Sequence, residues 1–168
     1  YIQYREDSQS HSQSDNERFL IDFPVNLLSV VDQNDFDIVL TRQEERFDSK
    51  GQLVASDYDT RVALVVRVVD AETVRAMMLD WEESSASNLS TGFKELFSLS
   101  DEFKSPRFST ANYRDIALRY RNFPYPDRSV DYAVMTATDN DDYLVIASSR
   151  EQMFNIIDIL LGFGILGK

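Results

Sequence analysis

The chain has 168 residues, of which 43% are hydrophobic and 12% aromatic, and Asp and Glu outnumber Lys and Arg by 29 to 17. This apolar content is too high for a disordered chain and is typical of one globular domain. The formal charge of −12 argues against a general nucleic-acid binder, because phosphate binding requires clustered positive charge.

The first 17 residues differ in composition from the rest of the chain. Residues 5–17 contain no apolar side chain, so burial cannot offset the entropy that this segment would lose on ordering. We therefore predict a polar linker or exposed loop over residues 1–17 and a single α+β domain over residues 18–168. Because the chain begins with Tyr1 rather than Met, we also expect it to be a processed or excised piece of a longer protein.

Alternating apolar residues predict strands in the N-terminal half of this domain. The segments that the pattern favours are residues 18–23, 36–40 and 53–55. Residues 48–51 are typical of a turn in which Gly51 takes a positive φ, whereas residues 25–31 are ambiguous between helix and strand. The strongest strand is residues 60–69, because a nearly continuous apolar run is typical of a central strand buried on both faces.

Helical spacing begins after this strand. Asp70 can cap a helix that extends to Glu83, and Ser90 can cap a second short helix. The remaining predicted elements are a loop at residues 101–112, a strand at 116–123, a hairpin of residues 130–138 and 143–147, and a final helix with Ser148 and Glu151 at capping-box spacing. Short connections make the late strands antiparallel. The predicted fold is therefore α+β, a largely antiparallel sheet with helices packed on one face.

Two stretches resemble an uncharacterised group of bacterial proteins that is common in ultra-small candidate-phylum bacteria. One is the strand-to-helix run at residues 62–83, which contains Asp80-Trp81-Glu82, and the other begins Tyr-Arg-Asp-Ile-Ala-Leu-Arg-Tyr-Arg at Tyr113 and continues in residues 130–135 and 142–154. In that group, a domain of this kind follows a single N-terminal transmembrane helix. The resemblance implies a membrane tether upstream of Tyr1 and an extracytoplasmic location. The group has no known activity, so the resemblance identifies no functional residue.

Acidic clusters are the candidate metal sites. Asp139, Asp141 and Asp142 lie in the predicted hairpin turn, and carboxylate oxygens of this kind suit calcium. The cluster lacks the glycine and the twelfth-position glutamate of an EF-hand loop. Asn and Asp also favour tight turns, so a solvated turn is the favoured interpretation and a calcium site is the alternative. We predict no cofactor, and the absence of cysteine excludes thiol nucleophiles and cysteine-ligated metals.

Recognised catalytic motifs are missing from the sequence, which has no Gly-x-Ser-x-Gly, phosphate loop or dinucleotide fingerprint. Acidic pairs such as Glu44-Glu45 and Glu82-Glu83 are adjacent in sequence. Neighbouring residues point in different directions on a helix or strand, so these pairs are poor acid–base dyads. A carboxylate-based hydrolase acting on envelope glycans is the enzymatic alternative, and it would need two distant acids to meet in a cleft.

Basic and aromatic residues are concentrated between residues 103 and 128. The residues that we predict to contact a partner, an unknown protein or an envelope component, are Arg114, Arg119, Arg121, Tyr125 and Arg128. The alternative is a solvent face whose arginines pair with surrounding acids, with Arg119 and Arg121 on the strand face opposite Leu118. The sequence therefore favours a non-enzymatic, extracytoplasmic interaction or scaffold module, with a hydrolase and a calcium or small-ligand sensor as alternatives.

Overall fold

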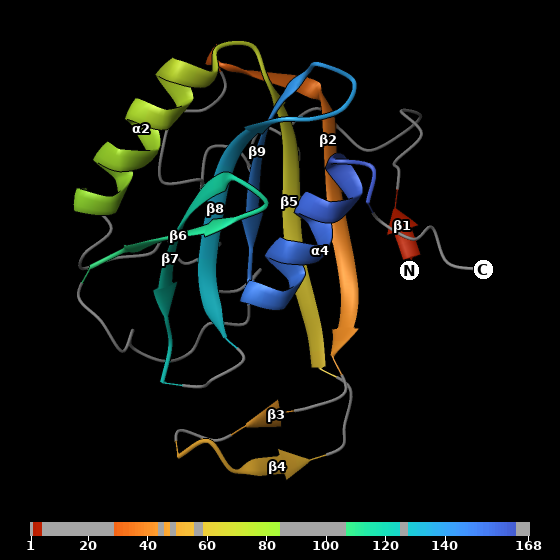
Figure 1. The fold of residues 1–168 in the computed structure, drawn as a ribbon, viewed down its shortest axis with the longest axis vertical. Coiled ribbons are helices and arrows are strands. Elements are labelled where there is room, and N and C mark those ends of the chain that lie inside the picture. Colours follow the sequence, from red (N-terminus) through yellow and green to blue (C-terminus); the bar gives the residue numbers. More distant parts are fainter. Residues whose placement is uncertain are drawn as a thin grey trace.

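A computed structural model describes residues 2–4, 29–43, 46–47, 50–55, 59–84, 107–124 and 128–163. Within these ranges, seven strands form one antiparallel sheet in the order β1-β2-β5-β9-β8-β7-β6 (Figure 1). The strands of this sheet are β1 (Ile2–Tyr4), β2 (Val31–Gln43), β5 (Asp59–Val68), β6 (Ser109–Tyr113), β7 (Ile116–Asn122), β8 (Ser129–Thr136) and β9 (Asp142–Ala147). The predicted antiparallel sheet is confirmed, although the architecture is mostly β rather than an even mixture of α and β.

In the described ranges, two helices pack on the sheet, and a small hairpin projects from one end of it (Figure 1). The helices are α2 (Ala71–Ser84) and α4 (Arg150–Leu160), and the hairpin consists of β3 (Arg46–Phe47) and β4 (Leu53–Ala55). Gly51, in the connection between β3 and β4, has the predicted positive φ of 75°. The predicted strand at residues 18–23 and the second short helix lie outside the described residues, as do residues 5–17 of the predicted linker.

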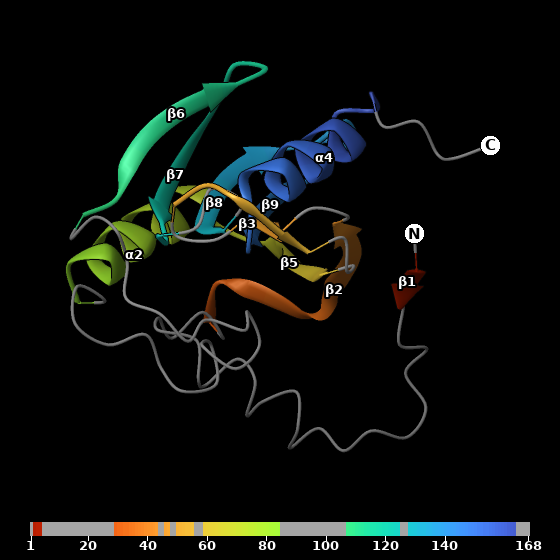
Figure 2. The same cartoon turned by 90° about the horizontal axis from the view of Figure 1, so that it is seen from below.

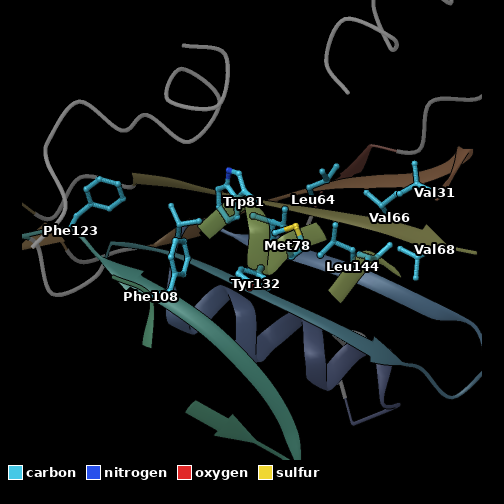
Figure 3. Packing of buried hydrophobic residues seen from close by; sticks show 13 residues of the cluster. Val31, Leu64, Val66, Val68, Met78, Trp81, Phe108, Phe123, Tyr132 and Leu144 are labelled. Atoms are coloured by element: carbon cyan, nitrogen blue, oxygen red, sulfur yellow. The ribbon is translucent and has the colours of Figure 1, made fainter. Parts of the chain in front are cut away.

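The two helices cover opposite faces of the sheet, so the prediction that both pack on one face is wrong. Apolar side chains on β5 alternate between the faces: Leu64 and Val66 belong to the α2 side, and Ala63 and Val65 belong to the α4 side. The α2 residues buried on the first side are Val74, Met78 and Trp81, and the α4 residues buried on the second are Met153, Ile156 and Ile157. Figure 3 shows Met78 and Trp81 near Leu64 and Leu144. Because β5, β8 and β9 are apolar on both faces, both faces need a covering helix.

Local capping explains where the helices begin. Asp70 caps α2 as predicted, since its carboxylate accepts hydrogen bonds from the backbone N–H and the hydroxyl of Thr73 at 3.1 and 2.7 Å. The cap of α4 is Ser149 rather than the predicted Ser148, and its hydroxyl accepts from the Gln152 N–H at 3.2 Å. Ser148 instead accepts from the Val62 N–H at 2.9 Å and so joins this turn to β5.

Candidate functional site

The β6–β7 hairpin is attached to the sheet along only part of its length. β7 pairs with β8 from Asn122 opposite Ser129 as far as Arg119 opposite Tyr132, whereas β6 and β7 stay paired up to their turn. The start of β7, residues 116–118, therefore has no partner in β8. Figure 2 shows the hairpin rising away from the sheet on the side where α4 lies.

Contacts with α4 hold the hairpin in this position. The Tyr113 ring stacks on Phe154 with centroids 4.0 Å apart, and the Tyr113 hydroxyl donates to Asp158 at 3.1 Å. Arg114 forms an ion pair with Asp158, and its guanidinium lies 4.3 Å from the centre of the Phe163 ring. Arg114 and Asp115 have φ values of 48° and 64°, as a two-residue turn of type I′ requires. The tip is thus bound to α4 instead of continuing beside β8.

A groove of about 450 Å³ lies where β7 and β8 separate, and α2 closes its third side. Its lining is mostly apolar and consists of Leu79, Ile116, Ala117, Tyr132, Ala133, Val134 and Met135, with Arg75, Asp115, Arg119 and Thr136 as the polar members. Leu79 is half exposed on α2 and Ala117 is exposed on β7. The volume is in the range of ligand-binding clefts, and small Ala117 leaves one wall open.

One edge of β8 lines this groove without a neighbouring strand in the part of the chain that the structure describes. The Ala137 N–H donates to Asp141 O at 2.9 Å, toward the β9 side. Because backbone groups alternate in direction along an antiparallel strand, those of Val134 and Thr136 face the groove. Arg75 Nη2 donates to Val134 O at 3.3 Å. A flexible side chain thus contacts a carbonyl that a further strand could use.

A fixed polar cluster forms one wall of the groove. Glu82 on α2 pairs with Arg119 on β7 and accepts from the Tyr132 hydroxyl at 2.5 Å. Burial raises the pKa of Tyr132, and the hydrogen bond to Glu82 raises it further. The hydrogen bond with Glu82 likewise raises the pKa of Arg119. Tyr132 also packs edge-on against Trp81 and Phe108 at centroid distances of 6.0 and 5.8 Å (Figure 3). These contacts fix the position of Arg119.

The predicted partner residues occupy different environments. Arg119 lines the groove, Arg114 lies at the hairpin tip, and Arg128 is half-buried beside β8. Arg121 is only 5% exposed, and burial lowers the pKa of its guanidinium. The expectation of a solvent face is therefore wrong for Arg121, whereas the partly exposed Arg119 pairs with the acid Glu82, as that alternative predicts. Tyr125 lies outside the described residues.

The aspartates of the β8–β9 turn are bound to protein donors. Asp139 accepts from the Asp141 N–H and the Tyr143 hydroxyl at 3.0 and 2.9 Å, and Asp141 pairs with Arg67 at 3.1 Å. Asp142 accepts from Thr136 Oγ1 at 2.6 Å. Within the described ranges, no three His, Cys, Asp or Glu side chains are placed to hold a metal ion. These carboxylates stabilise the turn that the sequence predicted.

A buried ion pair was missed by sequence reasoning. Asp131 on β8 is completely buried and accepts a hydrogen bond from Arg150 Nε at the start of α4. Burial raises the pKa of Asp131, although the hydrogen bond from Arg150 opposes this shift. Among the described residues, Ser129 Oγ and the second Asp131 oxygen have no hydrogen-bond partner. The sequence feature that could have indicated this pair is Asp131 itself, the one acid within the otherwise largely apolar residues 130–135.

No protein-family model, curated protein or solved structure matches the chain. Neither of the helices in the described ranges has the length and apolar character needed to cross a bilayer. The candidate site is therefore defined by the geometry of α2, β7 and β8 alone.

Proposed function

We propose that this domain is a non-enzymatic interaction module that binds an extended segment of a partner protein in the groove between α2, β7 and β8. The observation that carries this proposal is the end of β7–β8 pairing at Arg119 and Tyr132. Beyond this point, the edge of β8 at residues 134–136 faces a mostly apolar groove. An extended peptide can add to such an edge, with its main chain giving affinity and alternate side chains giving specificity.

Binding in this mode requires only local rearrangement. Arg75 would have to leave Val134 O, but its side chain is 43% exposed and it keeps its contact with Glu72 at 2.5 Å. The peptide would then bond to Val134 and Thr136 and cover the exposed side chain of Leu79. Burial of this apolar surface is the main favourable contribution to binding.

The composition of the groove supports binding rather than glycoside hydrolysis. Among the described residues that line the groove, Asp115 is the one carboxylate, whereas a carboxylate-based hydrolase needs two acids across its cleft. Glu82 is bound by Arg119 and Tyr132, and buried Asp131 neighbours α4 on the other face of the sheet. The residues around this groove therefore favour recognition of a partner.

The extracytoplasmic, tethered location is a separate part of the proposal and is supported by the sequence resemblance. It can be tested on the full-length gene product by membrane fractionation and by adding protease to intact cells after the outer layers have been removed. We expect the domain to sediment with membranes and to be digested from outside. Recovery in the soluble fraction, or protection from external protease, would reject the location without affecting the groove.

Peptide selection tests the binding function directly. A displayed library of random 12-residue peptides would be selected on the whole chain, and the affinity of the selected peptides would be measured by calorimetry. Ala117→Arg fills the groove and should abolish binding. Ala76→Arg, the same change at an exposed α2 position outside the groove lining, should not. Selected peptides that bind Ala117→Arg as well as the unmodified protein would show that the groove is not the binding site.

A further inference from the structure

β6 is the outermost strand of the sheet, and in the described part of the chain no strand covers its outer edge. Its sequence, Ser-Thr-Ala-Asn-Tyr from Ser109 to Tyr113, contains neither charge nor proline, although 27% of the whole chain is charged. It pairs with β7 in unbroken register, without a bulge. Charges, prolines and bulges are the usual protection of edge strands against pairing with another chain. β6 has none of these.

The turn of the hairpin determines which backbone groups of β6 face outward. Tyr113 and Ile116 flank the two-residue turn and therefore bond to each other. By alternation, Ala111 also bonds toward β7, whereas the N–H and C=O groups of Thr110 and Asn112 point away from the sheet. Both of these residues are exposed. Each copy of the chain thus offers two donors and two acceptors along one edge.

We propose that β6 pairs antiparallel with β6 of a second copy of this chain, in a register centred on Ala111. Thr110 of each copy then lies opposite Asn112 of the other, so that every outward-facing backbone group of these two residues gains a partner. A register centred on Thr110 or on Asn112 leaves half of these groups without a strand partner. The interface is symmetric, as a two-fold dimer requires.

Charge favours this edge over the rest of the surface. The chain carries a charge of −12, which opposes association of two copies through most of their surface. Charge is lower around β6, because Arg114 pairs with Asp158, Arg119 pairs with Glu82 and Arg121 is buried. The register centred on Ala111 brings Arg107 of each copy level with Asp115 of the other, and both residues are exposed. The interface is therefore neutral in the middle and complementary in charge at both ends.

Sedimentation equilibrium of the whole chain tests this dimer over a range of protein concentrations. We expect a reversible dimer that weakens about tenfold to hundredfold in Asn112→Pro, because proline removes an outward N–H from each copy. Asn112→Ala keeps this N–H and should dimerise like the unmodified protein. A chain that stays monomeric up to about 1 mM, or an Asn112→Pro variant that dimerises normally, would overturn the proposal.

A charge exchange tests the register. Arg107→Glu and Asp115→Lys should each weaken the dimer, and the double variant should regain it because the two charges are then opposite again. Circular dichroism would verify that each variant is folded. A dimer that the single changes do not weaken, or that the double variant does not restore, would rule out the Ala111-centred register. Although Asp115 also lines the groove, both measurements are made without peptide, so neither result depends on peptide binding.

Discussion

The completely buried carboxylate of Asp131 accepts a hydrogen bond from Nε of Arg150, whose guanidinium lies 3.9 Å from the centre of the Tyr120 ring. The two charged side chains are not equally buried, since that of Arg150 is 31% exposed and that of Asp131 is fully buried. Water can therefore solvate the arginine if it loses its partner, but it cannot solvate the aspartate. The ion pair is structurally asymmetric, and its two halves should respond differently to mutation.

We predict that Arg150→Ala destabilises the fold far more than Asp131→Asn. The first variant leaves an uncompensated buried carboxylate, which should cost about 3–5 kcal/mol. The second leaves a partly hydrated arginine and a neutral amide, which should cost about 1–2 kcal/mol. Urea unfolding measures both values, and the double variant should be more stable than Arg150→Ala alone. Equal losses in the two single variants would contradict the asymmetry.

The free energy of unfolding should depend on pH in part through the ionisation of Asp131. Burial raises its pKa in the folded state above the ordinary value of 3.8, so the folded protein holds this proton more tightly than the unfolded chain. This contribution to stability is fully present below the ordinary pKa and is lost as the pH rises through the folded pKa. Relative to Asp131→Asn, the unmodified protein should therefore lose free energy of unfolding as the pH rises above 3.8 and through the raised pKa of the folded state. Parallel stability curves for the two proteins would contradict this assignment.

Glu82 should be important for stability as well as for the groove wall. Glu82→Gln removes the charge that binds Arg119 and weakens the acceptor of the Tyr132 hydroxyl, so we expect a loss of about 1.5–3 kcal/mol. Glu83→Gln changes an exposed neighbour in the same way and should have almost no effect. Chemical unfolding of both variants measures the difference. If the two substitutions cost the same, the Glu82 cluster does not stabilise the fold.

Removing the hairpin anchor should open the hairpin without unfolding the sheet. Asp158→Asn weakens the contacts with Tyr113 and Arg114 that hold the turn on α4. We expect faster hydrogen exchange at the amides of β6 and at the start of β7, with unchanged exchange in β5 and β9. Asp80→Asn, on the exposed surface of α2, is the matched control. A uniform increase in exchange over all strands would show global destabilisation instead.

Much of the fold could be predicted because apolar periodicity is strong where elements are central. The predicted strand at residues 60–69 and the helix after Asp70 correspond closely to β5 and α2. β6 was predicted as loop because an edge strand buries few side chains and so leaves little periodic signal. β2 extends well beyond the predicted residues 36–40, because polar residues 32–35 interrupt its pattern at an irregularity in the pairing with β5.

The candidate site was harder to predict because it depends on tertiary placement. The basic stretch was visible in the sequence, and it supplied Arg119 to the groove. The alternation of side chains along this stretch does not reveal that α2 and α4 cover opposite faces of the sheet. The burial of Arg121 could therefore not be predicted from the sequence. The groove itself results from the early separation of β7 from β8, which no local pattern encodes.

Amide hydrogen exchange at Val134 and Thr136 tests the binding groove most directly, because these two N–H groups face it from β8. We expect both amides to exchange rapidly in the free protein and to become protected when a selected peptide saturates the groove. Neighbouring Ala133 and Met135, which bond toward β9, should be protected in both states. Slow exchange of Val134 and Thr136 without peptide, or unchanged rapid exchange at saturation, would contradict strand addition at this edge.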